Sequence, residues 1–544
     1  MKAILLNPVK ERTHSPGVLQ LYLYLKNNGV EVEYADVNLD AGHCAALKRL
    51  LKHHPGDILW LGLPSDFLAH NRTARFVNTV RGWGYTGHIS LGGEFPTMYP
   101  ERYLDMPIDS VVLGRGEPVV AELLRRLDAG QDWRTIPGLA FRNGSGIQRN
   151  PNTLLAPSWD QIPENMDLVN FDDTARDIHI QSAGFASCPN RCTWCPDRIA
   201  FTAAGYRRVP VAFKPAARVK KEILYGIERT RQWYAEHLPD AEEKAVSIYV
   251  HDCDAFSTPE LLERNAEIAR WVSAELLPNL SDLSLYWFLW GTVRSLLPLS
   301  QEHLELLIAS HCTILVGIES FSDSQLRRFG KGTTRAQNLA ICEKLGLDGT
   351  GILMIFLDPW TTAQEMLDNW TGYMSVLRCP KPVDLKQVDK CLELLPGTPM
   401  YKRFLPVARR YKQSKVGAIY QYDLLDPNAN RLKQILSQFV HYWTSLREAQ
   451  QKVCEDKQHP LYAAFRARGF SKCTFCEIGW HKQTDQRFKR VFMRILELGV
   501  QAEGKWWRAA EELARQEILA LKQDLEAHIV EGKTLFEWAM EYQR

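Results

Sequence analysis

Short apolar runs alternate with amphipathic stretches along most of this chain, and this alternation limits the folds that it can adopt. The first 145 or so residues contain five strand-like runs, at 3–6, 30–34, 58–63, 88–93 and 110–114. The stretches between them have helical spacing, and strands joined by helices of this length predict right-handed crossovers in a doubly wound parallel sheet. In such a sheet the ligand lies beyond the carboxyl ends of the strands.

The alternation resumes after a segment rich in Pro, Asn and Asp at 150–173, which we interpret as a linker. Six more strand-like runs follow, at 178–183, 247–250, 285–289, 313–317, 351–357 and 391–395, and they predict a partial barrel. Beyond Pro406 the pattern is helical and strand-poor, with helical runs at 431–452, 486–499 and 504–542. The predicted fold class is therefore α/β, with four parts: a Rossmann-like domain at 1–150, a linker at 151–175, a partial (β/α)6 barrel at 176–405 and a mainly helical domain at 406–544.

Composition excludes several classes of protein. The chain has 544 residues, of which 45% are hydrophobic and 24% are charged, as in ordinary globular proteins. Its formal net charge of +2 argues against a nucleic-acid partner. No apolar stretch is long enough to span a membrane, and the N-terminal apolar run is too short for a signal peptide. We therefore expect a cytoplasmic protein, whose 12 cysteines are thiols or metal ligands rather than disulfides.

Three cysteines in one short loop are the strongest chemical signal. Cys188, Cys192 and Cys195 are spaced four and then three residues apart, so their thiolates can converge on one iron–sulfur cluster. Three protein ligands leave one iron open to a ligand that is not protein. The alternative is a structural zinc site, but that needs a fourth ligand, and no further Cys or His follows before His237.

This loop, with Trp194 between the second and third cysteines, resembles the CxxxCxxC loop of radical SAM enzymes. The segments 316–320 and 330–334 are similar to that family's fourth strand and the loop after it, and 394–401 is similar to its sixth strand. The segments 91–101 and 109–117 resemble the cobalamin-binding domain that precedes the barrel in one large subgroup. The chain thus resembles cobalamin-dependent radical SAM enzymes, most of which are methyltransferases.

The resemblance implies a [4Fe-4S] cluster, S-adenosylmethionine (SAM) and cobalamin as cofactors, with Cys188, Cys192 and Cys195 as the cluster ligands. It implies SAM contacts from Trp194, Glu319, Arg294 and Ile352. Glu319 at a strand end suits the cationic amino group or the ribose, and Arg294 suits the carboxylate. Asp252 and Asp254, at the mouth of the second barrel strand, are further candidates for contacts with SAM or substrate. The sequence assigns no catalytic residue.

For cobalamin, the resemblance implies contacts from three loops: Pro64, Ser65 and Asp66; Gly92, Gly93 and Glu94; and Gly114, Gly116 and Glu117. The Asp-x-His-x-x-Gly loop that supplies a histidine ligand in other cobalamin proteins is absent. We therefore expect base-off cobalamin without a histidine below the cobalt. His70 is the one residue of the loop at 65–71 that could coordinate, and we interpret it as an ordinary helix-start histidine.

A second cysteine group, Cys473 and Cys476 with Cys454 upstream, is a weaker signal. It could bind another metal, but free thiols are the simpler interpretation. The other cysteines, Cys253 among them, are interpreted as small core residues.

The leading functional hypothesis is methyl transfer to an unreactive carbon, or to phosphorus, after activation by a 5′-deoxyadenosyl radical. The alternative with the same cofactors is ring closure, ring contraction or oxidation, and a third is a cobalamin sensor without turnover. No leader-peptide-binding domain is obvious at either end, which favours a small-molecule substrate, such as a natural-product intermediate, over a peptide. The other expected partner is an electron donor such as flavodoxin or ferredoxin.

Overall fold

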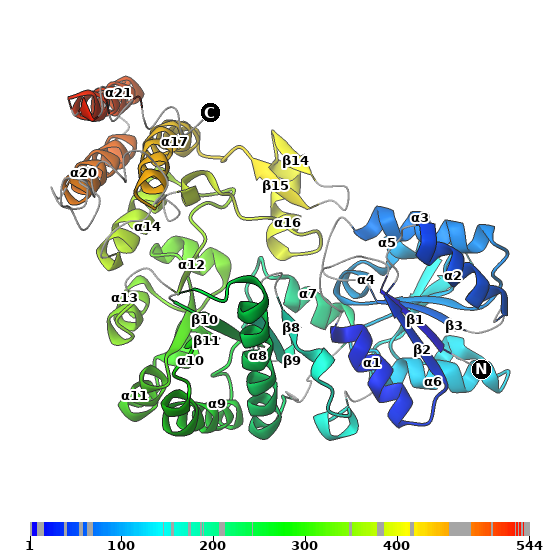
Figure 1. Cartoon of the computed structure of the whole chain (residues 1–544). Coiled ribbons are helices and arrows are strands. Elements are labelled where there is room, and N and C mark those ends of the chain that lie inside the picture. Colours follow the sequence, from blue (N-terminus) through cyan, green and yellow to red (C-terminus); the bar gives the residue numbers. More distant parts are fainter. Residues whose placement is uncertain are drawn as a thin grey trace. The chain divides into compact units, whose positions relative to one another are not determined.

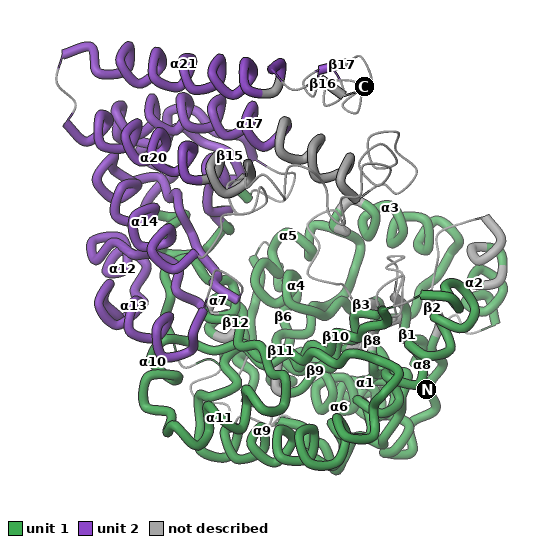
Figure 2. The backbone as a smooth tube through the Cα atoms, turned by 60° about the vertical axis from the view of Figure 1, so that its left-hand side comes forward, with its two compact units in different colours: residues 1–316, 395–402, 414–418 green, residues 317–394, 403–413, 419–544 purple. Residues whose placement is uncertain are grey.

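The structure is a computed structural model. It describes residues 3–7, 16–36, 41–53, 58–62, 69–144, 146–153, 157–171, 176–184, 188, 190–205, 213–241, 243–347, 351–377, 386–413, 418–455, 480–501, 504–527, 529–530, 533–534 and 537. The chain forms two compact units, drawn in different colours in Figure 2. Unit 1 comprises 1–316, 395–402 and 414–418, and unit 2 comprises 317–394, 403–413 and 419–544. One boundary falls inside a strand and another inside a helix, so those two elements continue from one unit into the next.

The N-terminal region is the expected sheet with helices on both faces, drawn at the blue end of the colour bar in Figure 1. Its strand order is β2-β1-β3-β4-β5-β6-β7, and neighbouring strands from β2 to β5 pair in parallel. The parallel strands are β1 (Ala3–Asn7), β2 (Val32–Asp36), β3 (Ile58–Gly62), β4 (Ile89–Gly92) and β5 (Ser110–Val112). Two antiparallel strands that the sequence did not predict, β6 (Leu139–Asn143) and β7 (Gly146–Arg149), complete the sheet.

Alternate residues of β1 face opposite sides of this sheet, as a strand requires. Ala3 and Leu5 belong to a buried cluster with α1 (Pro16–Asn27) and α6 (Glu117–Asp128). Ile4 and Leu6 belong to a cluster on the other face, with α2 (Ala41–His53) and α3 (Ala69–Gly82). Two short helices, α4 (Glu94–Met98) and α5 (Pro100–Leu104), follow β4 and add to the second cluster.

The predicted linker carries structure of its own. It contains two 3-10 turns, η2 (Trp159–Gln161) and η3 (Met166–Leu168), and the short strand β8 (Asn170–Phe171). Trp159, Ile162 and Leu168 are buried together with Leu19 and Leu23 of α1. This part of the chain is therefore packed against α1.

The second sheet has the order β13-β12-β11-β10-β9-β8. Its strands beyond β8 are β9 (Asp177–Gly184), β10 (Ala245–Asp252), β11 (Ser284–Thr292), β12 (Cys312–Glu319) and β13 (Ile352–Met354), and β9, β10 and β11 pair in parallel. The strand expected at 391–395 is reduced to isolated bridges. Cys391 pairs with Leu357, whereas Leu394 pairs in the opposite sense with Ile419, so the segment does not continue as one parallel strand.

One face of β10 is covered and the other is more open. Val246, Ile248 and Val250 are fully buried, whereas Tyr249 and His251 are partly exposed. The helices associated with this sheet include α8 (Ala216–His237), α9 (Pro259–Trp271), α10 (Val293–Leu296) and α11 (Gln301–Ala309). The alternation means that helices bury one side of each strand and leave the other side as the inner face of a partial barrel.

The rest of the chain is mainly helical, as the sequence predicts for 406–544, although four of its helices lie within the region predicted as barrel, 176–405. Its helices are α12 (Asp323–Phe329), α13 (Arg335–Lys344), α14 (Ala363–Val376), α16 (Pro399–Phe404), α17 (Pro427–Glu455), α20 (Trp480–Gln501) and α21 (Trp506–Glu526). Two hairpins interrupt this pattern, β14 (Tyr411–Gln413) with β15 (Ile419–Tyr422), and β16 (Ile529–Val530) with β17 (Lys533–Thr534). The helix expected at 504–542 therefore ends earlier, at Glu526. No helix among the described residues is both long and apolar enough to cross a membrane.

Candidate functional site

The three cysteines lie between the end of β9 and the start of α7 (Pro196–Ala203). Cys192 is buried, Cys188 and Cys195 are half-buried, and none of the three forms a disulfide with a described residue. Burial raises the pKa of Cys195, and the charges of Asp197, Cys192 and Cys188 raise it further. Cys188 and Cys192 therefore both lie close enough to Cys195 to influence its thiol electrostatically. Cys195 is the N-cap residue of α7, where the helix dipole favours a thiolate.

No group of three or more His, Cys, Asp or Glu side chains in the described part of the chain is arranged to hold a single metal ion. The ligands of an iron–sulfur cluster bind separate iron atoms and so stand farther apart than the ligands of one zinc ion.

The cluster loop is hydrogen-bonded to the segment 396–400, which is part of the predicted sixth-strand region. The Met400 backbone N–H donates to the Thr193 carbonyl oxygen at 3.1 Å. The Tyr99 hydroxyl donates to the Pro396 carbonyl oxygen at 2.5 Å. Tyr99 immediately follows α4, so one segment contacts both the cysteine loop and the N-terminal region. All four residues belong to unit 1.

The indole N–H of Trp194 lacks a hydrogen-bond acceptor among the described residues. Its Nε1 atom is buried. A buried N–H without an acceptor is costly and uncommon in native proteins. The position beside the cysteines therefore fits a ligand that supplies an acceptor.

Asp197 and Cys253 form a contact that the sequence did not indicate. The Cys253 thiol donates to Asp197 Oδ2 at 3.3 Å, which brings the loop after β10 to the start of α7. Cys253 was interpreted as a core residue, although its place between Asp252 and Asp254 at a strand end was a sign of a site.

Burial raises the pKa of Glu94, at the start of α4, to about 7, and the charge of Asp197 contributes. Acidic groups from the predicted cobalamin and cluster loops therefore interact.

Asp252 and Asp254 are both occupied by internal partners. Asp252 pairs with Arg264, which also donates to the Ser182 hydroxyl at 2.7 Å. Asp254 accepts hydrogen bonds from the Thr292 and Ser295 hydroxyls at 2.9 and 2.8 Å. These pairings fix the ends of β9, β10 and β11 relative to one another.

A ladder of rings crosses the inner face of the second sheet. His179 Nδ1 lies 2.8 Å from His251 Nε2, and their rings stack at 5.1 Å. His251 also stacks on Trp290 at 4.7 Å, and Tyr249 stacks on Phe288 at 4.6 Å. Burial and the neighbouring His179 lower the pKa of His251 to about 4. His251 is therefore neutral at pH 7. The side chains on this face of the sheet are mainly stacked aromatic rings.

Glu319 occupies a strained position at the end of β12. Its φ of 63° lies in the left-handed region, which costs about 1–2 kcal/mol for a residue with a side chain. Its buried carboxylate lies 3.3 Å from the buried Lys331 Nζ. A Cβ at Gly317 would lie 2.8 Å from Glu319 Oε1, so a larger residue there would force the carboxylate to shift. Burial raises the pKa of Glu319, and Lys331 opposes that shift.

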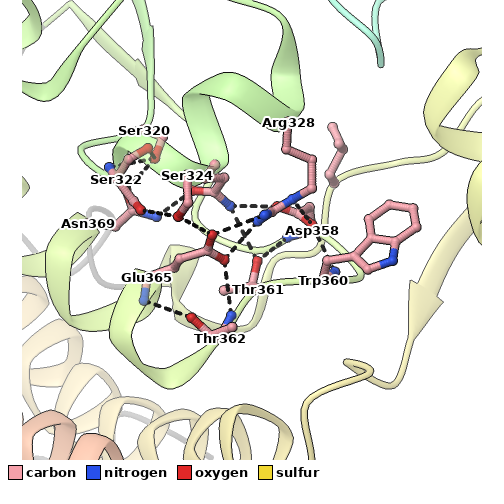
Figure 3. A network of polar contacts seen from close by, with 12 residues as sticks. Ser320, Ser322, Ser324, Arg328, Asp358, Trp360, Thr361, Thr362, Glu365 and Asn369 are labelled. Carbon is pink, nitrogen blue, oxygen red and sulfur yellow. Dashed lines mark hydrogen bonds and ion pairs between the residues drawn. The ribbon is translucent and has the colours of Figure 1, made fainter.

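A polar network fixes the chain directly after Glu319 (Figure 3). Asn369 Oδ1 accepts from the Ser320 hydroxyl and the Phe321 backbone N–H, both at 2.7 Å. Arg328 forms ion pairs with Asp358 at 2.7 Å and Glu365 at 2.8 Å. Buried groups on α12, α14 and the loop before α14 thereby immobilise the strand end on which Glu319 lies.

The other predicted SAM residues differ in exposure. Ile352 begins β13 and is half-buried, whereas Arg294 on α10 is exposed and forms no ion pair with another described residue.

Two of the three predicted cobalamin loops are described. Gly93 has φ 121° and precedes α4, and Gly114 has φ 74°, so both adopt backbone conformations that favour glycine. The buried Thr97 hydroxyl donates to the Gly93 carbonyl oxygen at 2.7 Å and accepts from the Gly114 N–H at 2.9 Å. This hydroxyl joins the two loops, which follow β4 and β5.

The remaining predicted loop residues have mixed outcomes. Gly92 ends β4, and Gly116 is the N-cap residue of α6. Glu117 is buried and paired with Arg115 at 2.8 Å. His70 Nε2 lies 3.3 Å from the Arg102 carbonyl oxygen, a contact that suits the interpretation of His70 as a structural histidine. Pro64, Ser65 and Asp66 lie outside the described residues, as do Cys473, Cys476 and the side chain of Cys454.

No family model matches the chain. It is 30% identical over 291 residues to an uncharacterized methyltransferase of Pyrococcus horikoshii, covering 51% of this chain and 56% of that protein. It is 26% identical over 231 residues to the anaerobic magnesium-protoporphyrin IX monomethyl ester cyclase of Synechocystis, covering 39% of this chain and 45% of that protein. The chain thus spans about half the length of the curated relatives it matches.

Solved structures give the fold over a longer span. The cobalamin-dependent SAM radical enzyme OxsB, solved with aqua-cobalamin and SAM bound, aligns with a TM-score of 0.61 at 15% identity, covering 100% of this chain and 83% of that one. The radical SAM methyltransferase TsrM from Kitasatospora setae, solved with tryptophan substrate and a SAM analogue, aligns with a TM-score of 0.54 at 16% identity, covering 81% of this chain and 89% of that one. The chain therefore has the fold of cobalamin-dependent radical SAM enzymes.

Proposed function

We propose that this protein is a cobalamin-dependent radical SAM methyltransferase that acts on a small molecule. The observation that carries the proposal is the set of three cysteines in one loop that ends at the start of α7, in a chain with this fold. The name of the Pyrococcus relative supports methyl transfer. When bound, the [4Fe-4S] cluster and SAM supply radical chemistry, and cobalamin supplies a methyl group.

The residues of this chain bind and orient those groups. Cys188, Cys192 and Cys195 are the proposed cluster ligands, and the fastening of Thr193 to Met400 keeps their loop in place. Trp194 offers its unpartnered indole N–H beside them. Glu319, oriented by Lys331 and by the strained backbone, is proposed to bind the SAM amino group or ribose, with Arg294 near the SAM carboxylate and Ile352 against the adenine.

Cobalamin is proposed to bind base-off along the loops that contain Gly92, Gly93, Glu94, Gly114, Gly116 and Glu117, together with Pro64, Ser65 and Asp66. Positive φ angles at Gly93 and Gly114 support a close approach of backbone to a bulky ligand. The contact of His70 with Arg102 supports the absence of a histidine below the cobalt.

The second candidate is ring chemistry without methyl transfer, which the cyclase name of the Synechocystis relative favours. Incubation of the reconstituted enzyme with methyl-labelled SAM and candidate substrates separates the two. Label in the product supports methyl transfer. Deoxyadenosine and a modified product without label would overturn it in favour of ring chemistry.

A further inference from the structure

The aromatic rings on the inner face of the second sheet form a stack that crosses three strands. It runs from His179 on β9, through Tyr249 and His251 on β10, to Phe288 and Trp290 on β11. All five side chains are half-buried, whereas the residues that alternate with them along the strands are buried. A group of large aromatic side chains that stays partly accessible is typical of a ligand-binding site.

The stack is complete on one side and open on the other. Tyr249 lies between His179 at 5.0 Å and Phe288 at 4.6 Å, and His251 lies between His179 at 5.1 Å and Trp290 at 4.7 Å. Within the described part of the chain, Phe288 and Trp290 contact only rings of β10. Their faces toward β12 therefore have no aromatic partner.

The next strand does not continue the stack, because β12 contains no aromatic residue. Its half-buried residues Thr313 and Leu315 alternate with the buried Ile314 and Val316, so they lie on the same face as the rings. Both are shorter than a tryptophan side chain, and neither covers the whole face of the Trp290 indole. A flat ring bound there becomes the next member of the stack.

Two nitrogen atoms at this end of the stack are available for hydrogen bonds. His251 uses Nε2 for its contact with His179, and His251 Nδ1 and the Trp290 indole N–H have no hydrogen-bond partner among the described residues. Burial lowers the pKa of His251 to about 4, so the ring is neutral at pH 7 and its Nδ1 either donates or accepts one hydrogen bond. Polar atoms of a bound ring can therefore be recognised.

The inner face has almost no charge. Asp177, at the first position of β9, is the only Asp, Glu, Lys or Arg among the alternate residues 177–181, 247–251, 286–290 and 313–315. A phosphate or carboxylate placed against the rings would lose water without gaining a cation, which is costly. The face therefore suits a neutral ligand.

The open end of the stack lies toward the cysteine loop. His251 and Trp290 are each two residues nearer the carboxyl end of their strand than Tyr249 and Phe288. Cys253, two residues after His251, donates to Asp197 Oδ2 at 3.3 Å, and Asp197 belongs to the helix that begins directly after the third cysteine of the loop. All of these residues belong to unit 1.

We propose that Phe288 and Trp290 stack on a neutral, planar aromatic or heteroaromatic ring of the substrate, and that Trp290 Nε1 and His251 Nδ1 hydrogen-bond to its polar atoms. The inference rests on the proposed function, because it names the class of substrate for that reaction. Stacking needs a flat ring, so the site selects against saturated, puckered molecules. The lack of charge selects against phosphorylated and zwitterionic ones.

The test compares the binding of 2-naphthol and decahydro-2-naphthol. The two probes share the carbon skeleton and the hydroxyl group, and both are neutral at pH 7, but only 2-naphthol is flat and aromatic. The full-length chain is loaded anaerobically with cluster, hydroxocobalamin and SAM, and the cluster is kept oxidised so that SAM stays intact. Equilibrium dialysis gives the dissociation constants.

Two variants change the open end of the stack. Trp290→Leu removes its last ring, and Trp290→Phe keeps a ring but removes the N–H. Trp233→Leu is the matched control, because Trp233 of α8 is half-buried and stacks on a histidine, His237, at 5.0 Å, but does not belong to the inner face.

We expect the wild type to bind 2-naphthol about fivefold or more tightly than the saturated probe. Trp290→Leu should weaken 2-naphthol by about fivefold or more, Trp290→Phe by about twofold to fivefold, and Trp233→Leu by less than about twofold. Equal affinities for the two probes in the wild type, or an unchanged 2-naphthol affinity in Trp290→Leu, would overturn the proposal. If Trp290→Leu does not fold, Trp290→Phe and the wild-type comparison of the probes decide.

The same titration without SAM shows which ligand the rings bind. SAM should not weaken the binding of 2-naphthol, and if SAM displaces it, the rings bind SAM and the proposal is wrong. A methyl-labelled product without a planar ring would also overturn the proposal, while it would support methyl transfer. A holoenzyme that binds 2-naphthol at Trp290 but forms neither deoxyadenosine nor labelled product with any aromatic candidate would refute the proposed function instead.

Discussion

The buried Lys331 ammonium lies 3.3 Å from the buried Glu319 carboxylate, and Gly317 provides the space in which the carboxylate lies. The two residues are 12 positions apart, and the turn formed by α12 brings them together. A carboxylate with a left-handed backbone and a single close cation has little freedom to reorient. This rigidity suits a residue that must meet one charged group of a ligand.

Lys331→Met should leave the Glu319 carboxylate buried without its cation. Removal of one partner of a buried pair costs about 3–5 kcal/mol when the other stays charged. The raised pKa of Glu319 should then rise further, so the glutamate favours protons more in the folded than in the unfolded state. The stability deficit against wild type should therefore grow as pH rises from about 5 to 8. Thermal unfolding midpoints across that range measure it.

The double variant Lys331→Met/Glu319→Gln is the control, because it removes the titrating group. Its deficit against wild type should not grow as pH rises, since only the wild type keeps the raised pKa of Glu319. A deficit in Lys331→Met that shrinks as pH rises would contradict the assigned direction of the pKa shift.

Replacement of Cys188, Cys192 and Cys195 together by Ala should abolish cluster assembly and reductive cleavage of SAM while leaving the helical content intact. Iron and sulfide analysis, the cluster absorbance and deoxyadenosine formation report the loss. Cys342→Ala is a suitable control, because Cys342 is a buried cysteine of α13 that does not belong to the loop. Deoxyadenosine production by the triple variant would refute the cluster assignment.

Gly93→Ala should weaken the binding of hydroxocobalamin by tenfold or more. With φ 121° and ψ −179°, Gly93 has a conformation that essentially only glycine adopts, so an alanine there is strained by about 1–3 kcal/mol and should shift the loop. Gly130→Ala is the matched control, with a positive φ and nothing within 4 Å of the added Cβ. Spectroscopic titration of both variants decides, and equal affinities would argue against the loop as a cobalamin contact.

The cobalt(II) form of the bound cobalamin should be base-off and free of a histidine ligand. His70→Ala should therefore leave its electron paramagnetic resonance spectrum unchanged. A coordinating nitrogen splits each high-field line into three. A triplet pattern in the wild type that disappears in His70→Ala would make His70 the lower ligand.

The parallel core was predictable from sequence, because each strand carries its own apolar signal. The apolar run Ala3–Leu6 predicts a buried strand without any information about the strands that pair with it. The β6–β7 hairpin was missed, since only Leu139, Ala140 and Phe141 are buried in it and the outer strand is largely exposed. The strand expected at 391–395 depends on which partner each residue finds, and Leu394 pairs with Ile419 rather than continuing alongside Leu357.

The candidate site was predictable only where its chemistry is local. Three cysteines within eight residues are recognisable from the sequence. The contact of Cys253 with Asp197 is not, because it joins positions 56 residues apart. The sequence does not predict the left-handed backbone of Glu319, because a glutamate has no preference for that conformation. Its cause is tertiary, since the strand end is held by Lys331 and by the network around Asn369 and Arg328.

A single hydroxyl, that of Thr97, bonds to the loops at both Gly93 and Gly114. Because both loops bond to the same hydroxyl, a displacement of one loop also displaces the other, and the spacing between the two loops is fixed. The spacing of the two loops proposed to bind cobalamin thus depends on the hydroxyl of one buried side chain.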